Sequence, residues 1–169
     1  MPNTKFSPLA AAFLALTMQA ASANSDDAAR GETVSWTAAA PSAAVKPGAP
    51  VTLTVQGKVL EGWHVYGLKQ LPNGPTPLKL GVDANPAAVS DGAAGGSATT
   101  KVHDRGFDLD VEYYSSAFAL TMPVRIAAGA AAGVQTVPLS VRFQTCNDRI
   151  CQPPKTVHLS ASVNVQAGG

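Results

Sequence analysis

The chain has 169 residues, of which 46% are hydrophobic and only 14% are charged. Its 12 Lys and Arg residues nearly balance its 11 Asp and Glu residues, so it lacks the basic excess of a nucleic-acid-binding surface or a polybasic membrane anchor. We therefore expect no nucleic-acid partner. The 15 Gly and 13 Pro residues are typical of a turn-rich β protein rather than a helical bundle.

The beginning of the chain has the pattern of a cleaved export signal. Lys5 supplies a positive start, residues 9–18 form a short apolar run, and residues 21–23 (Ala-Ser-Ala) match a cleavage site. The apolar run is shorter than the roughly 20 residues that span a bilayer. We predict a signal peptide over 1–23, a flexible N-terminus over 24–32, and a soluble, exported protein that does not insert into the membrane.

The remaining chain has the pattern of short strands separated by Pro and Gly. Apolar residues alternate strictly in 51–55, which indicates a strand with one buried face. Further strands are predicted near 63–68, 75–80, 118–126, 137–143 and 156–165. Pro123 interrupts one of them, so we expect this strand to be bulged or to lie at a sheet edge. The Gly-rich residues 85–100 are predicted to be a flexible connection.

These strand signals predict the fold class. No segment shows a helical apolar stripe of ten residues or more, whereas seven to nine short strands with turns between them indicate a sandwich or barrel. The length suits one domain. We predict an all-β, immunoglobulin-like β-sandwich over residues 33–166.

The two cysteines, Cys146 and Cys151, lie between the last two strong strand signals. A disulfide between them would close a ring of six residues, which stabilises a fold by only about 2 kcal/mol and opens without unfolding the domain. Arg149 inside the ring favours a reactive thiolate. The spacing alone leaves three interpretations open: a structural staple of a hairpin, a pair for redox exchange, or a metal site completed by His64 or His103.

Several segments resemble one known family. The most specific is Cys146-Asn-Asp-Arg-Ile-Cys151-Gln-Pro-Pro154, followed by Thr156-Val-His-Leu159. Together with Glu61-Gly-Trp-His-Val-Tyr66 and Asp104-Arg-Gly-Phe107, it resembles the N-terminal periplasmic domain of the thiol:disulfide interchange protein DsbD. The resemblance extends over roughly residues 34–165. The best-known member has one more residue between its cysteines and an aromatic residue in place of Gln152.

The resemblance implies a periplasmic immunoglobulin-like domain that relays reducing equivalents from a membrane electron donor to thioredoxin-fold proteins. It implies a role in electron transfer and in cytochrome c maturation. Cys146 and Cys151 would be the redox pair, with Cys151 forming the mixed disulfides and Phe107 capping them. The expected surroundings of the pair are Trp63, His64, Tyr66, Asp104 and Arg149. We expect no cofactor and no metal.

Two further expectations concern the partners and the activity. The chain stops at Gly169 without a transmembrane segment, so we expect the electron donor to be a separate membrane protein. The activity implied is that of a protein-disulfide reductase or an interchange component. The alternative is a non-catalytic immunoglobulin-like binding module in which the hairpin disulfide is purely structural.

Overall fold

The computed structural model describes residues 32–168. The predicted signal peptide (1–23) and all but the last residue of the predicted flexible segment (24–32) lie outside these residues. The described chain forms twelve strands and no helix, which confirms the all-β prediction. Within these residues, no helix is long and apolar enough to cross a membrane.

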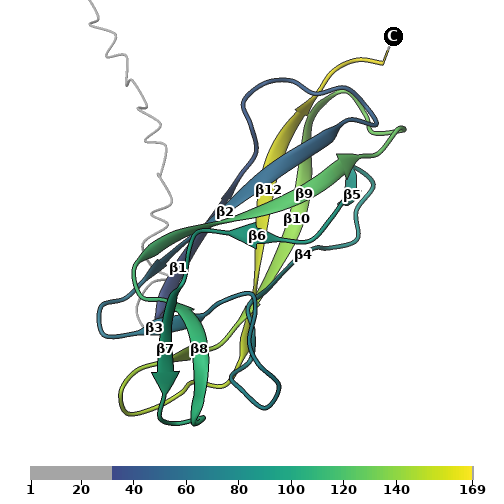
Figure 1. The fold of residues 1–169 in the computed structure, drawn as a ribbon. Helices are drawn as coiled ribbons and strands as arrows, with labels where there is room; N and C mark the ends of the chain where they lie inside the picture. Colours follow the sequence, from purple (N-terminus) through teal and green to yellow (C-terminus); the bar gives the residue numbers. More distant parts are fainter. Residues whose placement is uncertain (1–31, 169) are drawn as a thin grey trace, which may run out of the picture.

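Two antiparallel sheets form the body of the domain (Figure 1). One has the order β1-β2-β9-β5, with β6 also paired to β9, and the other has the order β12-β10-β4. This arrangement is that of the A-B-E-D and G-F-C sheets of an immunoglobulin domain, so the immunoglobulin-like prediction is confirmed. The strands are β1 (Val34–Ala39), β2 (Pro50–Val59), β4 (Lys79–Val82), β5 (Ala88–Ser90), β6 (Gly95–Gly96), β9 (Ala117–Ile126), β10 (Gly133–Phe143) and β12 (Lys155–Val165).

The core lies between these two sheets and follows the alternation of the sequence. Every second residue of β2 and β9 is buried, and so is every second residue of β10 from Val137 to Phe143, as expected for strands with one face on a core. Trp36 packs between the sheets, with its ring 5.5 Å from that of Phe118 and 5.0 Å from that of Phe143. The largest fully buried aliphatic side chains include Leu53, Leu120 and Leu139.

A third antiparallel sheet has the order β11-β3-β8-β7. Its strands are β3 (His64–Tyr66), β7 (Thr100–Asp104), β8 (Leu109–Tyr114) and β11 (Thr145–Cys146). Figure 1 shows β3, β7 and β8 at the end of the sandwich farthest from the C-terminus. The predicted strand over 63–68 is thus shorter than expected, and it belongs to this end sheet rather than to the main body.

Two predictions were wrong, one about the strand that contains Pro123 and one about residues 85–100. Strand β9 lies inside its sheet, not at an edge, because it pairs with β2 on one side and with β5 and β6 on the other, and its register with β2 continues through Pro123 without a bulge. Pro123 falls in the gap between the residues paired with β5 (124–126) and those paired with β6 (120–121). Its missing N–H therefore costs no ladder hydrogen bond, while its carbonyl still accepts one from Asp91 at 2.9 Å. Residues 85–100 are not a plain connection, since they contain β5 and β6.

Candidate functional site

Cys146 and Cys151 form a disulfide across the tip of a tight hairpin. They face each other as an isolated antiparallel bridge with their Cα atoms 4.0 Å apart. Backbone hydrogen bonds of 2.9 Å flank the pair on both sides, from Asn147 N to Ile150 O and from Gln152 N to Thr145 O. The two cysteines therefore occupy a non-hydrogen-bonded pair position, where opposing side chains come closest.

The turn between the cysteines is organised by Asn147. Its side-chain oxygen accepts hydrogen bonds from the backbone N–H groups of Arg149 and Ile150, each at 2.9 Å. Asn favours such turns because its amide replaces a backbone partner. The turn is therefore held by hydrogen bonds of its own in addition to the disulfide.

The two sulfur-bearing residues differ strongly in exposure. Cys146 is 2% exposed and packs with Tyr66 and Val111, whereas Cys151 lies on the surface. Its neighbour Ile150 is 58% exposed, so the surface beside the accessible cysteine is apolar. A thiol–disulfide exchange requires a thiolate to approach one sulfur directly, and exposure favours Cys151 as the residue attacked.

The end sheet brings the residues around the pair onto one face. In the β11–β3 ladder Cys146 lies opposite His64, and in the β3–β8 ladder Tyr66 lies opposite Tyr113. Directly opposed residues share a face of a sheet, so these side chains surround the buried cysteine. They line a hollow of about 720 Å³, here called the disulfide hollow, together with both cysteines, the 147–150 turn and the β7–β8 turn.

Asp104 connects the β7–β8 turn to this face. One carboxylate oxygen accepts the Tyr66 hydroxyl at 2.8 Å, and the other accepts the backbone N–H groups of Gly106 and Phe107 at 2.8 and 3.3 Å. The half-buried Phe107 ring meets the Tyr66 ring edge to face, with centroids 6.0 Å apart. The turn that carries Phe107 is thus anchored to the residue that packs on Cys146.

Two titratable groups of the hollow are shifted by their surroundings. Burial, reinforced by the hydrogen bond to Asp104, raises the pKa of the Tyr66 hydroxyl. Burial lowers the pKa of the His64 imidazole, although the Asp104 and Asp148 carboxylates act in the opposite direction. Near neutral pH both side chains are therefore uncharged beside the disulfide.

The structure gathers seven of the eight predicted site residues at the disulfide hollow. Cys146, Cys151, Phe107, His64, Tyr66, Asp104 and Arg149 line it. Trp63 does not, because it precedes β3 on the opposite side of the alternation and packs against the main core. Tyr113 was missed by the sequence analysis, although Val111 and Tyr113 alternate with polar residues and indicate a strand with one apolar face.

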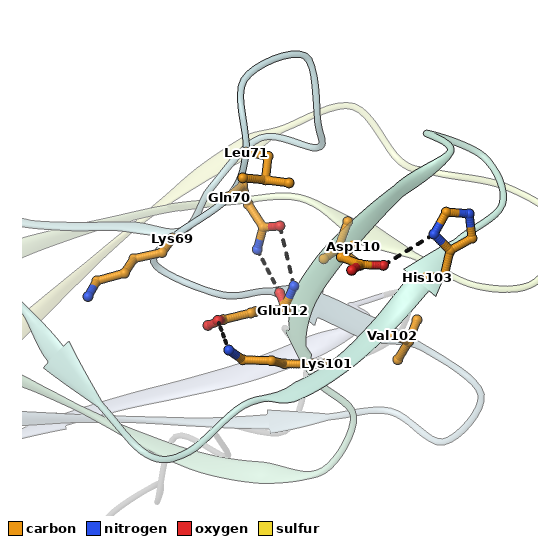
Figure 2. A pocket seen from close by; sticks show the side chains of 9 residues that line it. Lys69, Gln70, Leu71, Lys101, Val102, His103, Asp110 and Glu112 are labelled. Carbon is orange, nitrogen blue, oxygen red and sulfur yellow. Dashed lines mark hydrogen bonds and ion pairs between the residues drawn. The ribbon is translucent and has the colours of Figure 1, made fainter.

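A second hollow of about 480 Å³ lies on the β7–β8 hairpin (Figure 2). Its polar groups are mostly paired with one another. The Gln70 side chain donates to the Glu112 carbonyl at 2.6 Å, Lys101 lies 3.2 Å from the Glu112 carboxylate, and His103 lies 3.2 Å from Asp110. We therefore take the disulfide hollow as the candidate site.

Metal binding was one of the three open interpretations of the cysteine pair. In residues 32–168 no group of three or more His, Cys, Asp or Glu side chains is placed to hold a metal ion. Both cysteines are joined to each other.

The fold and the site together define a class, namely an immunoglobulin-like domain that presents a hairpin disulfide at one end. Residues 33–162 match the family model described as thiol:disulfide interchange protein DsbD, N-terminal. The match covers most of the chain, and the chain therefore belongs to this family of thiol–disulfide interchange domains. Domains of this family are periplasmic in general.

Comparisons with individual proteins add little to this assignment. No curated protein matches the chain. Among solved structures, AggA, the major subunit of aggregative adherence fimbriae type I from Escherichia coli, is 13% identical, with 79% of this chain and 94% of that chain covered and a TM-score of 0.34. A family 123 glycoside hydrolase from Clostridium perfringens is 7% identical, with 78% and 27% covered and a TM-score of 0.32.

Proposed function

We propose that this domain relays reducing equivalents in the periplasm through Cys146 and Cys151. It receives electrons from a membrane donor and passes them to thioredoxin-fold proteins. Family membership supports interchange chemistry in general. The observation that carries the proposal for this chain is the unequal exposure of a linked pair, with an accessible Cys151 beside a buried Cys146.

The exchange follows from this geometry. A thiolate of the donor attacks the Cys151 sulfur, the bond between the two cysteines breaks, and Cys146 leaves as a thiolate. The donor's second thiolate then attacks the donor sulfur of the mixed disulfide, which releases Cys151 as a thiolate and leaves the donor with a disulfide of its own. Two electrons have then passed from the donor to the cysteine pair. The reverse sequence, starting from the Cys151 thiolate and an oxidised thioredoxin-fold protein, passes the two electrons on.

The location and extent of the domain belong to the same proposal. We propose that residues 1–23 direct export and are removed, and that residues 33–166 form the exchange domain. The family's general periplasmic location and the described strands, which run from Val34 to Val165, support this. In an oxidising compartment, a cysteine pair can cycle only if a reductant is supplied to it.

The reduction potential of the pair tests the proposal against a structural staple. The oxidised chain is equilibrated with thiol–disulfide buffers of graded potential, and the fraction of free thiol is measured after acid quenching. An exchange pair has a potential above about −300 mV, whereas a structural bridge lies below it. A value well below this limit, with the native fold retained, would support the non-catalytic binding module instead.

Single-cysteine variants test which sulfur meets the partner. Cys146→Ser leaves the exposed Cys151 free, and we expect it to form a stable mixed disulfide with an oxidised thioredoxin-fold protein. Cys151→Ser leaves only the buried Cys146, and we expect at least tenfold slower adduct formation. Equal rates for the two variants in non-reducing gels or mass spectra would contradict the proposed role of Cys151.

A further inference from the structure

The proposed relay, on which this inference rests, contains one step that the cysteines do not complete alone. After Cys151 has formed a mixed disulfide with its partner, Cys146 must lose its proton before it attacks. Cys146 is 2% exposed and is packed against Tyr66 and Val111. A thiol in apolar surroundings resists ionisation because its thiolate is poorly solvated there. A base close to Cys146 would remove this obstacle.

His64 is the basic side chain that the fold places beside Cys146. The two residues are direct partners in the β11–β3 ladder. Their side chains therefore leave the sheet on the same face, with Cβ atoms about 5 Å apart by the general geometry of opposed pairs. Both also line the disulfide hollow. The antiparallel register, rather than proximity in the sequence, creates this pair.

The imidazole ring of His64 is fixed in place. It packs on Tyr66 with ring centroids 5.1 Å apart and on Tyr113 with centroids 4.7 Å apart. Its Nε2 atom is buried and has no hydrogen-bond partner among the described residues. A buried polar atom without a partner costs about 1–3 kcal/mol, so a fold that places one at a reactive site calls for a functional explanation.

We propose that His64 accepts the proton of Cys146 when the mixed disulfide on Cys151 is resolved. The Cys146 proton passes to the neutral imidazole, and the Cys146 thiolate attacks the Cys151 sulfur. The intramolecular disulfide forms, the bond from Cys151 to the partner breaks, and the partner leaves as a thiolate. The cysteine pair is oxidised by two electrons, the partner disulfide is reduced by two, and the proton remains on His64 until water removes it.

The charges around His64 suit both halves of this step. Burial lowers the pKa of the imidazole, so it is neutral and ready to accept a proton near pH 7. The carboxylates of Asp104 on β7 and Asp148 in the 147–150 turn favour the imidazolium once it forms. The other titratable or charged side chains that line the hollow are Tyr66, Tyr113, His103, Arg105 and Arg149.

The test follows the resolving step directly. The reduced chain is mixed with 5,5′-dithiobis(2-nitrobenzoate) in a stopped-flow spectrometer. The attack of Cys151 releases the first coloured thiolate, and the attack of Cys146 on the mixed disulfide releases the second. The two phases are recorded as a function of pH for the wild type, His64→Phe and His64→Gln. His158→Gln is the control, because His158 is 72% exposed and pairs with Asp83 on the main sandwich.

We expect the second phase of the wild type to reach a plateau above the His64 pKa, which lies below the ordinary value of about 6.5. In both His64 variants we expect the rate constant of this phase to be about 10²-fold lower at neutral pH and to increase tenfold for each unit of pH. It should meet the wild-type rate at alkaline pH, where the thiol ionises without a base. The first phase should change less than twofold in all variants.

Two results would overturn the inference. One is an unchanged second phase in the His64 variants. The other is a second phase slowed by the same factor at every pH, which indicates that the ring only positions Cys146. Neither result would contradict the proposed relay, which depends on the two cysteines and not on His64. The relay fails separately if the wild type releases only one equivalent of coloured thiolate, or if the first phase persists in Cys151→Ser.

Discussion

At the scale of single residues, Asp104 connects two parts of the surroundings of the disulfide, namely Tyr66 and the turn that carries Phe107. Its two carboxylate oxygens hold the Tyr66 hydroxyl on one side and the turn carrying Phe107 on the other. A hydrogen bond to a charged group contributes more to stability than one between neutral groups. Tyr66 is 1% exposed, so its hydroxyl has no access to water as a substitute.

We therefore expect Tyr66→Phe to lower the free energy of unfolding by about 1–2 kcal/mol, because the Asp104 carboxylate loses a partner in a half-buried place. Denaturant unfolding followed by fluorescence measures the change. Tyr113→Phe is the matched control, since the Tyr113 ring packs on His64 from the same sheet face. Equal stability of Tyr66→Phe and the wild type would show that the hydrogen bond contributes nothing.

Sequence reasoning found the cysteine pair and most of its neighbours, but not how they are connected. The spacing of Cys146 and Cys151 predicts a small ring, and this is a local property of the chain. The contact between Tyr66 and Asp104 joins residues 38 positions apart, and the pairing of His64 with Cys146 depends on the register of two short strands. Neither is encoded in a local pattern.

At the scale of elements, the β7–β8 hairpin forms one side of the end sheet, with β7 at its edge. Its cross-strand pair His103 and Asp110 is solvent-exposed, and Asp108 lies on the other side of the same imidazole at 3.1 Å. The hydrogen bonds to Asp110 and Asp108 raise the pKa of His103. The folded hairpin therefore binds this proton more tightly than the unfolded chain does.

It follows that protonated His103 stabilises the hairpin. The contribution is complete below about pH 6.5, the ordinary histidine value, and is lost as the pH rises through the higher folded pKa. An NMR titration of the ring should give a midpoint above that of an unfolded peptide, and Asp110→Asn should lower it. A midpoint at or below the peptide value would contradict this account.

The long strands were easier to predict than the short ones. Alternation over five or more residues identified β2, β9, β10 and β12, because each has one face on the core. β5 and β6, with three and two residues, are too short to show a period. They pair with β9 on either side of Pro123, so their existence depends on a tertiary contact rather than on a local pattern.

At the scale of the whole molecule, the stability of the domain resides in the main sandwich. The large core cluster draws on both main sheets and contains neither cysteine, while Cys146 belongs to a small separate cluster with Tyr66 and Val111. The disulfide closes only six residues, which limits its entropic effect to about 2 kcal/mol. Reduction should therefore leave the fold intact.

We expect the double variant Cys146→Ala/Cys151→Ala to remain folded, with the free energy of unfolding lowered by about 2 kcal/mol. Circular dichroism and denaturant unfolding measure this. Leu53→Ala, at a fully buried position of the main core, should cost about 2–5 kcal/mol and gives the scale for comparison. Loss of the folded state in the double variant would mean that the disulfide is needed for the fold, contrary to the proposed relay.

The two backbone hydrogen bonds that flank the cysteines have a consequence for partner choice. They join Asn147 to Ile150 and Thr145 to Gln152, and neither involves a sulfur atom. We therefore expect the hairpin to keep the same backbone conformation when the two cysteines are reduced. The backbone conformation alone would then give a partner protein little means of distinguishing the reduced domain from the oxidised one. In the proposed relay, complexes with either form would then have to dissociate quickly, so that unproductive ones do not slow the cycle.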